Sequence, residues 1–513
     1  MIAIEKSIIT KFPSMSERSV NLEKFPLDAL PMVLTDIAKQ TNKLMIIVLE
    51  EMSDTQALAD SLNLFLGKSD EYPVSILPDW ETLPYDSFSP HQDIISERLE
   101  ILANLPERNN GFLILPIKNL AHRFPPRNLI NSQKFSLQVG QTLNLQEERF
   151  RLSEAGYRNC ETVRERGEFA IRGAIFDIFP MGTDGPFRID MFDEVIESLR
   201  SFDPETQRSI KKVDYINILP AREVPLTEQG IKTFRSNWHK MFEGNPRLCP
   251  IYQDISNSID PPGIEYYAPL FFEAMSSLFD YLPDENLFFL VGDTQQKLEN
   301  FWTNLTNRYE SLRYNIQRPI LPPELLFFRS EEVFTKLNEI PKFLLKTETK
   351  IIDQRFEDLP NLTLKLKTDD PARELNLFLR EKCKKAIFLA ESPGRREVLQ
   401  NLLKRHSIVP LFKKNIEDIS TLSNETELLI GYLTNGFIFD GIALIPETAI
   451  FGTKVPQRRR RQQQIINQLI VSDISEIAIG DPVVHIDHGI GIYKGLEVIS
   501  LDDEIGEFVV IHY

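Results

Sequence analysis

A lysine that follows a glycine is the first residue pair in this chain whose type suggests chemistry, namely phosphate binding. Loops that hold ATP read G-x-x-x-x-G-K-[ST], because their backbone N–H groups cradle the phosphates and the lysine reaches the terminal ones. The chain has a single Gly-Lys pair, Gly67-Lys68, and leucine stands at position 62, where the first glycine belongs. We interpret Gly67 as the end of a helix. We therefore expect neither ATP hydrolysis nor a bound cofactor in this chain.

Metal binding is the second chemistry that residue types suggest. His485 and His488 lie close together, but no cysteine or third histidine stands beside them, so histidines of a turn or barrel remain the alternative to metal ligands. The three cysteines, Cys160, Cys249 and Cys383, are each separated from the next by about ninety residues or more. That spacing fits neither a zinc site nor a disulfide framework. We predict no metal site, and reduced thiols as in a cytoplasmic protein.

Protein recognition is the third chemistry, and an arginine and a phenylalanine on one strand face suggest it. The run 187–192 alternates, so Arg188 and Phe192 fall on the face opposite its apolar residues. Exposed aromatics beside arginine are typical of protein interfaces. The alternative is that Phe192 packs under a neighbouring domain and that the arginines are solvated, because single exposed apolar residues are ordinary. The residues alone leave both interpretations open.

Strand and turn signals around these residues predict a small antiparallel sheet over 157–208. Apolar and β-branched residues run from 169 to 179, and Gly173 within this run predicts a bulge or a close backbone approach. Turn residues then separate the run from two further strands, over 187–192 and 195–202. We expect a last strand, over 216–220, to close the sheet.

A parallel α/β layer is predicted from the segments that precede and follow this antiparallel sheet in the sequence. Helical periodicity alternates with short apolar runs before it, and again after it at strand 287–291 and helix 294–313. Such alternation predicts a parallel sheet, and its resumption predicts that the antiparallel sheet is a domain inserted into it. Before the insertion, the predicted helices are 27–39, 53–66 and 93–105, and the predicted strands are 43–49, 74–77 and 111–116.

Two further units are predicted after the layer. A second α/β unit has a helix over 371–385 with Asp370 as its N-cap, and a helix that begins at Pro393 after the N-cap Ser392. Its predicted strands are 386–390, 427–431 and 442–446. The segment 480–495 alternates small turn residues with β-branched ones, as small barrels do.

Composition limits the partners that the chain can have. Its 513 residues, 42% of them hydrophobic, are enough for several globular domains. Because the net charge is −17, contact with nucleic acid needs a local basic patch. Arg458, Arg459, Arg460 and Arg461 form one, as either a solvated tether or a nucleic-acid contact. The start lacks a signal-peptide core and no run of eighteen apolar residues occurs, so we expect a cytoplasmic protein.

A loop rich in aromatic residues precedes the third predicted helix. Trp80, Tyr85 and Phe88 stand there among acidic and turn residues. We predict that the loop is packed by its own aromatic side chains. His91 suggests chemistry, but nothing nearby fixes a nucleophile or a ligand set around it.

Three segments carry a likeness to a known family. They are D-W-E-T-L-P-Y-D-S-F-S-P-H-Q-D-I-I-S-E-R (79–98), R-G-E-F-A-I-R-G-A-I-F-D-I-F-P-M-G (166–182) and G-D-P-V-V-H-I-D-H-G-I-G-I-Y-K-G (480–495). In this order they resemble the amino-terminal half of the bacterial transcription-repair coupling factor, whose first part is similar to UvrB. The resemblance implies an α/β multidomain fold. Its parts are a degenerate RecA-like, UvrB-like α/β domain with an inserted small antiparallel β-rich domain, a second α/β domain, and a truncated CarD/Tudor-like β-barrel.

The resemblance also implies partners and contact residues. In the family the inserted domain recruits UvrA, and its contact residues correspond to Arg172, Arg188 and Phe192. The CarD-like module binds the β subunit of RNA polymerase, and its contact corresponds to Ile499, where the family pattern has leucine. ATP and magnesium bind in motor domains that this chain lacks. We therefore expect no enzymatic activity from the chain alone, and DNA contact mainly through those missing domains.

The expected function is that of an adaptor in transcription-coupled nucleotide-excision repair. The alternatives are an ATP-dependent DNA helicase or translocase subunit and a CarD-like transcription regulator. The expected domains are the UvrB-like domain at 1–134 and 221–340, the UvrA-binding insertion at 135–220, a linker at 341–359, the second α/β domain at 360–452, a basic linker at 453–474 and an incomplete polymerase-interacting domain at 475–513.

Overall fold

The computed structural model divides the chain into two compact units, Met1–Gly452 and Thr453–Tyr513. In the parts of the chain that it describes, no helix is long and apolar enough to cross a membrane. Arg458, Arg459, Arg460 and Arg461 lie outside the described residues. The described residues are 8–9, 12–14, 17–22, 25–67, 71–345, 353, 355–365, 370–414, 416, 426–452, 482–485, 489–501 and 504–512.

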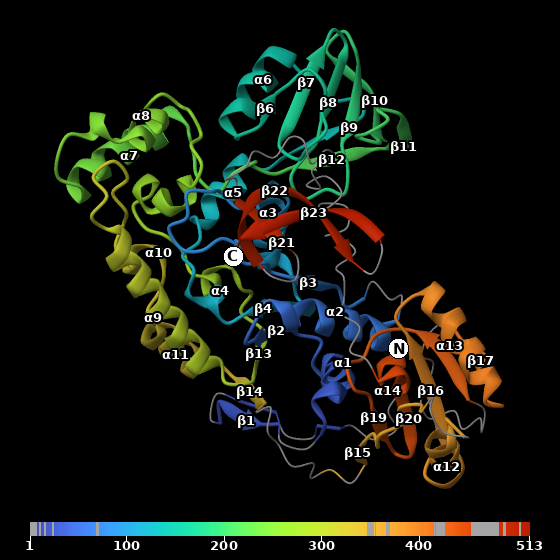
Figure 1. Cartoon of the computed structure of the whole chain (residues 1–513). Helices are drawn as coiled ribbons and strands as arrows, with labels where there is room; N and C mark the ends of the chain where they lie inside the picture. Colours follow the sequence, from blue (N-terminus) through green and yellow to red (C-terminus); the bar gives the residue numbers. More distant parts are fainter. Residues whose placement is uncertain are drawn as a thin grey trace. The chain divides into compact units, whose positions relative to one another are not determined.

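A six-stranded parallel sheet is the centre of the first unit (Figure 1). The predicted alternation of helices and strands is confirmed. Strand β13 lies directly beside β2, so the sheet does resume after the insertion. In spatial order the strands are β1 (Ser19–Asn21), β14 (Lys342–Leu345), β13 (Asn286–Val291), β2 (Leu44–Leu49), β4 (Gly111–Pro116) and β3 (Val74–Ile76).

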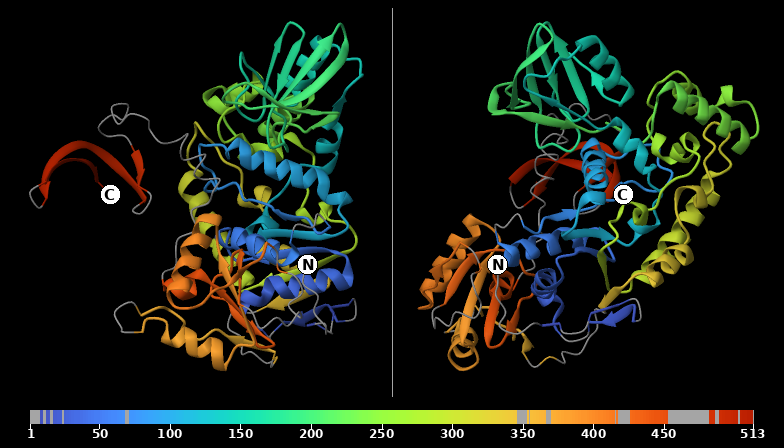
Figure 2. Two further views of the ribbon diagram at one scale, coloured as in Figure 1. Left: turned by 90° about the vertical axis from the view of Figure 1, so that its right-hand side faces the viewer. Right: turned by 180° about the vertical axis from the view of Figure 1, so that it is seen from behind.

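Both faces of this sheet are buried, which explains why its strands are continuous apolar runs. Alternate residues of β2 enter two cores. Met45 and Ile47 pack with helices α1 (Leu30–Thr41) and α2 (Ser53–Leu66), the blue helices beside the sheet in Figure 2. Ile46 and Val48 pack on the other side, with α3 (Gln92–Asn104) and α9 (Thr294–Leu312). Gly67 ends α2 with a φ of 70°, as predicted.

The insertion forms a second six-stranded sheet, drawn from teal to green in Figure 1. Its order is β11-β10-β9-β8-β7-β6, with every pair antiparallel except β6 with β7. Helix α6 (Leu145–Glu154) contributes Leu152 to the core beneath it. The strands are β6 (Arg158–Asn159), β7 (Glu168–Arg172), β8 (Ile175–Ile178), β9 (Phe187–Phe192), β10 (Val195–Phe202) and β11 (Ser209–Val213).

Two predictions for the insertion are wrong. The run 169–179 is not one strand with a bulge but two strands joined by a tight hairpin, because Arg172 pairs with Ile175. Gly173 has a φ of 62° there, a value that glycine adopts without strain. The strand at 216–220 does not close the sheet. It is β12 (Tyr215–Ile218), which pairs instead with β5 (Phe135–Gln138) in a separate two-stranded sheet.

Helices dominate the segment between the insertion and the linker. The second longest of them, shorter only than α9, is α7 (Glu228–Met241), which begins after the N-cap Thr227. The remaining helices of this part and of the loops around β4 are α4 (Lys118–Ala121), α5 (Arg127–Gln133), α8 (Pro250–Ser256), α10 (Pro323–Leu326) and α11 (Ser330–Glu339).

The second α/β part of the first unit has its own six-stranded sheet. The N-cap Ser392 is confirmed, since its hydroxyl accepts a hydrogen bond from the N–H of Arg395. The predicted N-cap Asp370 is wrong, because the helix begins two residues later than expected, at Arg373. The elements are β15 (Phe356–Asp358), β19 (Phe437–Phe439), β20 (Ile442–Pro446), β16 (Lys385–Ala390), β18 (Glu427–Ile430) and β17 (Leu411–Phe412), with α12 (Arg373–Glu381), α13 (Pro393–Arg405) and α14 (Glu447–Phe451).

In the described residues of the second unit, three strands form an antiparallel sheet. They are β21 (Pro482–His485), β22 (Gly489–Leu501) and β23 (Glu504–His512). Ile499 lies in β22, where its backbone is opposite Gly506. The strands agree with the predicted β character of this segment.

Candidate protein-binding face

One face of the insertion sheet brings the sequence-predicted residues together. We call it the outer face: the side chains of β7 to β10 that point away from the core. The opposite side chains are buried, which fixes the direction of the alternation. The buried side chains are Phe169, Phe176, Ile178, Ile189, Met191, Ile196 and Leu199. The outer face carries Ala170, Arg172, Ile175, Asp177, Arg188, Asp190, Phe192, Val195, Ser198 and Arg200.

A buried carboxylate joins the two predicted arginines. Asp177 on β8 has no exposed side-chain surface. Arg172 donates a hydrogen bond from Nη2 to its Oδ2 at 2.6 Å. Arg188 donates from Nε to Oδ1 at 2.7 Å and from Nη2 to Oδ2 at 2.9 Å, a bidentate geometry that fixes the guanidinium plane. Two arginines share one carboxylate, so the group carries a net positive charge.

The two arginines differ in exposure. Arg188 keeps only 18% of its side chain exposed, whereas Arg172 keeps 49%. The guanidinium of Arg188 lies 4.7 Å from the ring centre of Phe202 and donates to the carbonyl of Gln207 at 3.2 Å. Its hydrogen bonds to Asp177 raise the pKa of Arg188 above its ordinary value. Arg188 is thus enclosed by neighbours, while Arg172 is open to a partner.

Phe192 is the most exposed of the three predicted residues, at 70%. It ends β9, and the turn that follows has Asp193 at a φ of 52°. The face that alternation predicts for Phe192 is therefore confirmed. Ile175 and Val195 are exposed beside it, and sequence reasoning missed both. The signal for Ile175 was the Gly173-Ala174 hairpin, which gives Ile175 its own strand opposite Arg172. The signal for Val195 was its position directly after the two-residue turn that follows Phe192.

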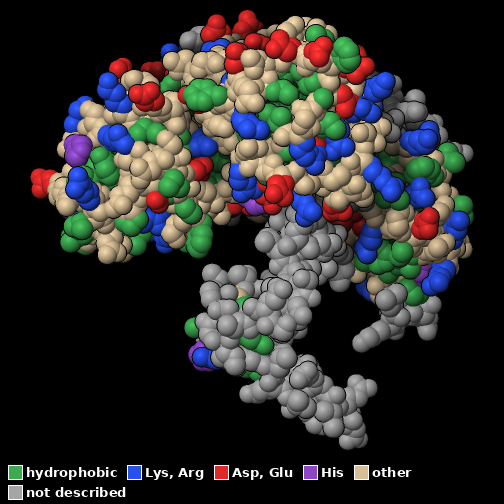
Figure 3. Space-filling view, turned by 90° about the horizontal axis from the view of Figure 1, so that it is seen from above, with side chains coloured by type: hydrophobic (Ala, Val, Ile, Leu, Met, Phe, Trp, Pro, Cys, Tyr) green, Lys and Arg blue, Asp and Glu red, His purple; other side chains and the backbone are tan. Residues whose placement is uncertain are grey.

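A second ion pair lies on the same face. Arg200 donates to Asp190 Oδ2, and the hydroxyl of Ser198 donates to the same oxygen at 2.6 Å. Burial alone would raise the pKa of Asp190, but these hydrogen bonds hold it below its ordinary value. Lysine, arginine, aspartate and glutamate are interspersed with hydrophobic side chains on the side of the molecule seen in Figure 3.

The carboxyl end of β2 is where a parallel sheet of this kind would hold phosphate. Acidic side chains occupy it. Glu50 accepts a hydrogen bond from the N–H of Asp293 at 2.6 Å, and Glu51 pairs with Lys297 at 2.7 Å. A side chain at Gly292 would collide with Glu50. The backbone donor and the lysine here are therefore bound to carboxylates rather than free for a phosphate.

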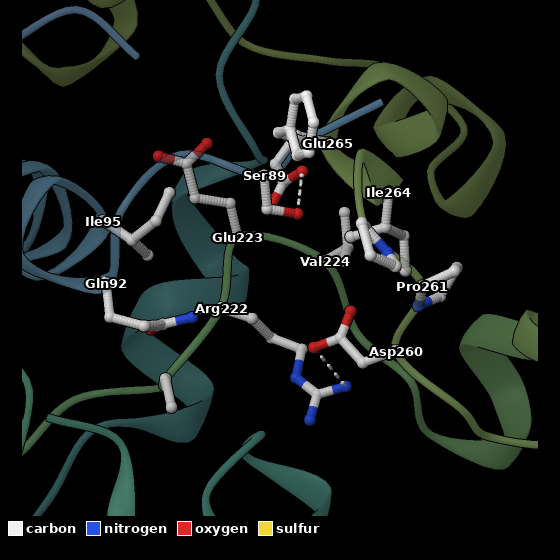
Figure 4. Close-up of a pocket in the computed structure, with 13 residues that line it drawn as sticks. Ser89, Gln92, Ile95, Arg222, Glu223, Val224, Asp260, Pro261, Ile264 and Glu265 are labelled. Carbon is white, nitrogen blue, oxygen red and sulfur yellow. Dashed lines mark hydrogen bonds and ion pairs between the residues drawn. The ribbon is translucent and has the colours of Figure 1, made fainter. Parts of the chain in front are cut away.

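A cavity of about 350 Å³ lies where the chain leaves the insertion, between residues 88–95, 221–224 and 260–265 (Figure 4). We call this region the root of the insertion. Glu223 on its wall accepts from Arg98 Nε at 2.8 Å, and Arg98 is fully buried. Glu265 accepts from the Ser89 hydroxyl at 2.9 Å, and burial raises the pKa of Glu265 to about 8. Arg222 faces Asp260 at 3.6 Å. These groups are held by one another, which indicates a structural role.

The prediction that the aromatic loop before α3 is packed by its own side chains is wrong. Aromatic side chains from distant parts of the sequence pack against it. The ring of Trp80 meets Tyr266 edge-on, with centroids 5.4 Å apart. Tyr85 lies 5.9 Å from both Tyr266 and Tyr309. Phe88 is exposed. The sequence pattern did not reveal that Trp80 and Tyr85 pack against Tyr266 and Tyr309, which lie far away in the chain.

Metal and thiol chemistry find no support in the described part of the chain. Within it, no group of three His, Cys, Asp or Glu side chains could hold a metal ion. His488 lies outside the described residues. Cys160, Cys249 and Cys383 are free thiols, and burial raises the pKa of each, which disfavours the reactive thiolate.

Comparison with family models finds three matches along the chain. Residues 135–224 match the UvrB interaction domain, which covers the insertion with the outer face. Residues 378–450 match the MFD D3 domain, within the second α/β part. Residues 477–513 match the CarD-like/TRCF RID domain, which includes strands β21 to β23.

Comparison with curated proteins finds relatives among the transcription-repair-coupling factors. The transcription-repair-coupling factor of Escherichia coli is 37% identical over 490 residues, which are 94% of this chain and 42% of the relative. That of Haemophilus influenzae is 37% identical over 498 residues, 95% of this chain and 43% of the relative. That of Bacillus subtilis is 24% identical over 515 residues. The chain thus spans less than half the length of these relatives, and it belongs to the transcription-repair-coupling factor family.

Proposed function

We propose that this chain is the adaptor part of a coupling factor, which recruits UvrA and contacts RNA polymerase during transcription-coupled nucleotide-excision repair. The observation that carries the UvrA half is the outer face. Arg172 and Phe192 are exposed on this one face with Ile175 between them, and Arg188 is linked to Arg172 through Asp177. An aromatic anchor next to an arginine is the composition that protein interfaces favour. The match of 135–224 to the UvrB interaction domain supports the same assignment.

The polymerase half of the proposal concerns the second unit. Its match to the CarD-like/TRCF RID domain supports a contact with the polymerase β subunit. We infer that β21 to β23 belong to a CarD/Tudor-like barrel and that Ile499 on β22 makes the contact. A nucleic-acid contact by Arg458, Arg459, Arg460 and Arg461 stays a prediction.

The first α/β part acts, in this proposal, as a scaffold that does not use ATP. It is a degenerate RecA-like domain of UvrB type, with carboxylates at the carboxyl end of β2. Negative side chains at that edge repel phosphate, and the nearby lysine is already paired with Glu51. This part of the protein therefore needs neither ATP nor magnesium for its role.

Binding of purified UvrA to immobilised chain tests the UvrA half. We expect the parent to bind and both Phe192→Ala and Arg172→Ala to lose at least tenfold in affinity, about 1.4 kcal/mol. Ile210→Ala is the matched control, because Ile210 is equally exposed on the same sheet but lies on the edge strand β11. Parent-like binding by Phe192→Ala would exclude the outer face as the UvrA site.

Two further measurements test the rest of the proposal. Binding to a fragment of the polymerase β subunit should be lost in Ile499→Arg and retained in Phe192→Ala. ATP turnover should be absent with and without DNA. DNA-stimulated turnover would instead favour a helicase or translocase subunit, and polymerase binding without UvrA binding would favour a CarD-like regulator.

A further inference from the structure

We propose that UvrA is contacted by a row of four side chains across strands β7 to β10, while Asp177 and Arg188 act beneath this row as a brace. The row consists of Arg172, Ile175, Phe192 and Val195. This inference rests on the function proposed above and deepens it. It assigns contact roles to two apolar residues and separates the two arginines into one that touches the partner and one that positions it.

Strand register makes the row continuous. Arg172 is directly opposite Ile175 across β7 and β8. Ile175 is opposite Asp190 on β9, so Phe192, two residues further on the same face, is its diagonal neighbour. Phe192 is directly opposite Val195 on β10. Diagonal neighbours of this kind lie about 7–8 Å apart, within reach of an aromatic side chain. Four strands thus contribute one contiguous strip.

The apolar members of the row are exposed together, which distinguishes them from scattered surface residues. Ile175 and Val195 are exposed at 37% and 40%, on either side of the more exposed Phe192. Ile210, by contrast, is a single exposed apolar side chain between serine and lysine on the edge strand. Clustered exposed apolar side chains mark interaction sites, whereas single ones are ordinary.

The other end of the outer face is closed. Ala170 and Phe202 form a small buried cluster there with Val163 and Phe179. The side-chain amide of Gln207 donates to the carbonyl of Val163 at 2.9 Å and ties the covering segments together. Arg188 lies at the border of this closed end, stacked on Phe202. Its small exposed fraction follows from that position, so a partner reaches the row without touching most of Arg188.

Asp177 and Arg188 form the brace because their bonds determine where Arg172 points. The carboxylate of Asp177 is held on one side by the bidentate bonds from Arg188 and binds Arg172 on the other. Without Asp177, two guanidinium groups would face each other and repel. Preorganised side chains bind more tightly, because less conformational entropy is lost in the complex.

The row also indicates the chemistry of the partner surface. Arg172 has one hydrogen bond to Asp177 through Nη2, and a guanidinium offers five N–H donors. Its remaining donors can meet a carboxylate of UvrA. Beside that carboxylate, the UvrA surface needs an apolar socket for Phe192, flanked by Ile175 and Val195. An acidic side chain next to an apolar pocket is therefore the complementary motif.

Affinity for UvrA, measured by surface plasmon resonance with the full chain, tests the row. We expect Ile175→Ser and Val195→Ser each to weaken binding about tenfold, and the matched control Ile210→Ser to leave it unchanged. If the parent binds UvrA but both row variants bind as it does, the row is wrong while the proposed function stands. If the parent does not bind UvrA at all, both the proposed function and the row are wrong.

A double-mutant cycle tests the brace. Its readout is the difference between the loss of UvrA affinity in the parent and the loss in the Arg172→Ala background, which a general loss of folding would not change. We expect Asp177→Asn to weaken UvrA binding about tenfold in the parent, but less than about threefold in the Arg172→Ala background, because the brace acts through Arg172. Arg188→Ala should behave in the same way and serves as the second variant if Asp177→Asn unfolds. Equal losses in both backgrounds would overturn the positioning role. Thermal melts of every variant establish that the folded protein is compared.

Discussion

Two arginine–carboxylate groups lie in opposite surroundings, one at the root of the insertion and one on its outer face. At its root, both partners of the pair Arg98–Glu223 are buried, and Arg98 lies over the rings of Trp80 and Phe124. On the outer face, the carboxylate of Asp177 is buried but Arg172 is half exposed. Protein surrounds both side chains of the root pair, whereas in the outer group the carboxylate is buried and Arg172 contacts solvent.

The difference shows how one type of pair can serve stability or recognition. A charge enclosed by protein cannot regain water when its partner is lost, so breaking the pair costs much stability. An exposed guanidinium keeps part of its hydration, so losing it costs the fold little. Its free donors can serve a partner instead. Exposure of the arginine, rather than the presence of the ion pair, separates the two roles.

The largest expected effect on stability is at the root. Arg98→Ala should lower the free energy of unfolding by about 3–5 kcal/mol, because Glu223 is left as a buried, unpaired charge. Urea denaturation measures this. Arg172→Ala is the matched control on the outer face and should lose less than about 1 kcal/mol. Equal losses in the two variants would remove the distinction between the regions.

A pH-dependent effect of intermediate size is expected in the same cavity. Burial raises the pKa of Glu265 to about 8 from an ordinary value of 4.5. The folded state therefore binds more protons between these values, and its stability falls as pH rises from 4.5 to about 8. Glu265→Gln, which mimics the neutral acid, should remove about 2 kcal/mol of this loss. Urea midpoints of parent and variant at pH 5 and pH 8 test it, and parallel pH profiles would contradict it.

A smaller loss of stability is expected for Arg188, whose side-chain exposure is intermediate between that of Arg98 and that of Arg172. Arg188→Ala should cost about 1–2 kcal/mol, because the ring of Phe202 loses its cover while Asp177 keeps Arg172. Thermal or urea unfolding gives the value. A loss as large as that of Arg98→Ala would mean that the outer group is structural like the root pair.

The smallest effect on stability is expected at Phe192. Phe192→Ala removes an exposed side chain and should change the free energy of unfolding by less than about 0.5 kcal/mol. Its affinity for UvrA should nevertheless fall at least tenfold. Denaturation and binding measured on one preparation separate the two quantities. Marked destabilisation would instead give Phe192 a role in packing, as in the alternative interpretation of the strand pattern.

Local pattern predicted most elements of the insertion but not its sheet order. The alternation in 187–192 placed Arg188 and Phe192 on one face, and the structure agrees. Gly173 was misinterpreted as a bulge, because a glycine in an apolar run is compatible with either a bulge or a hairpin turn. That choice decides which strand and which face carry Ile175 and Asp177. The sequence analysis therefore did not include these two residues in the candidate site.

The sequence by itself determined the residue types, the alternating faces and the helix ends, such as Gly67 and Ser392, because these depend on neighbours within a few residues. The same holds for the absence of a phosphate-loop motif. Only the tertiary structure decided that Asp177 joins Arg172 to Arg188, that Arg188 is covered and that Ile175 lies beside Phe192. Strand register and burial set these relations, and both depend on contacts between residues that alternation along one strand does not specify.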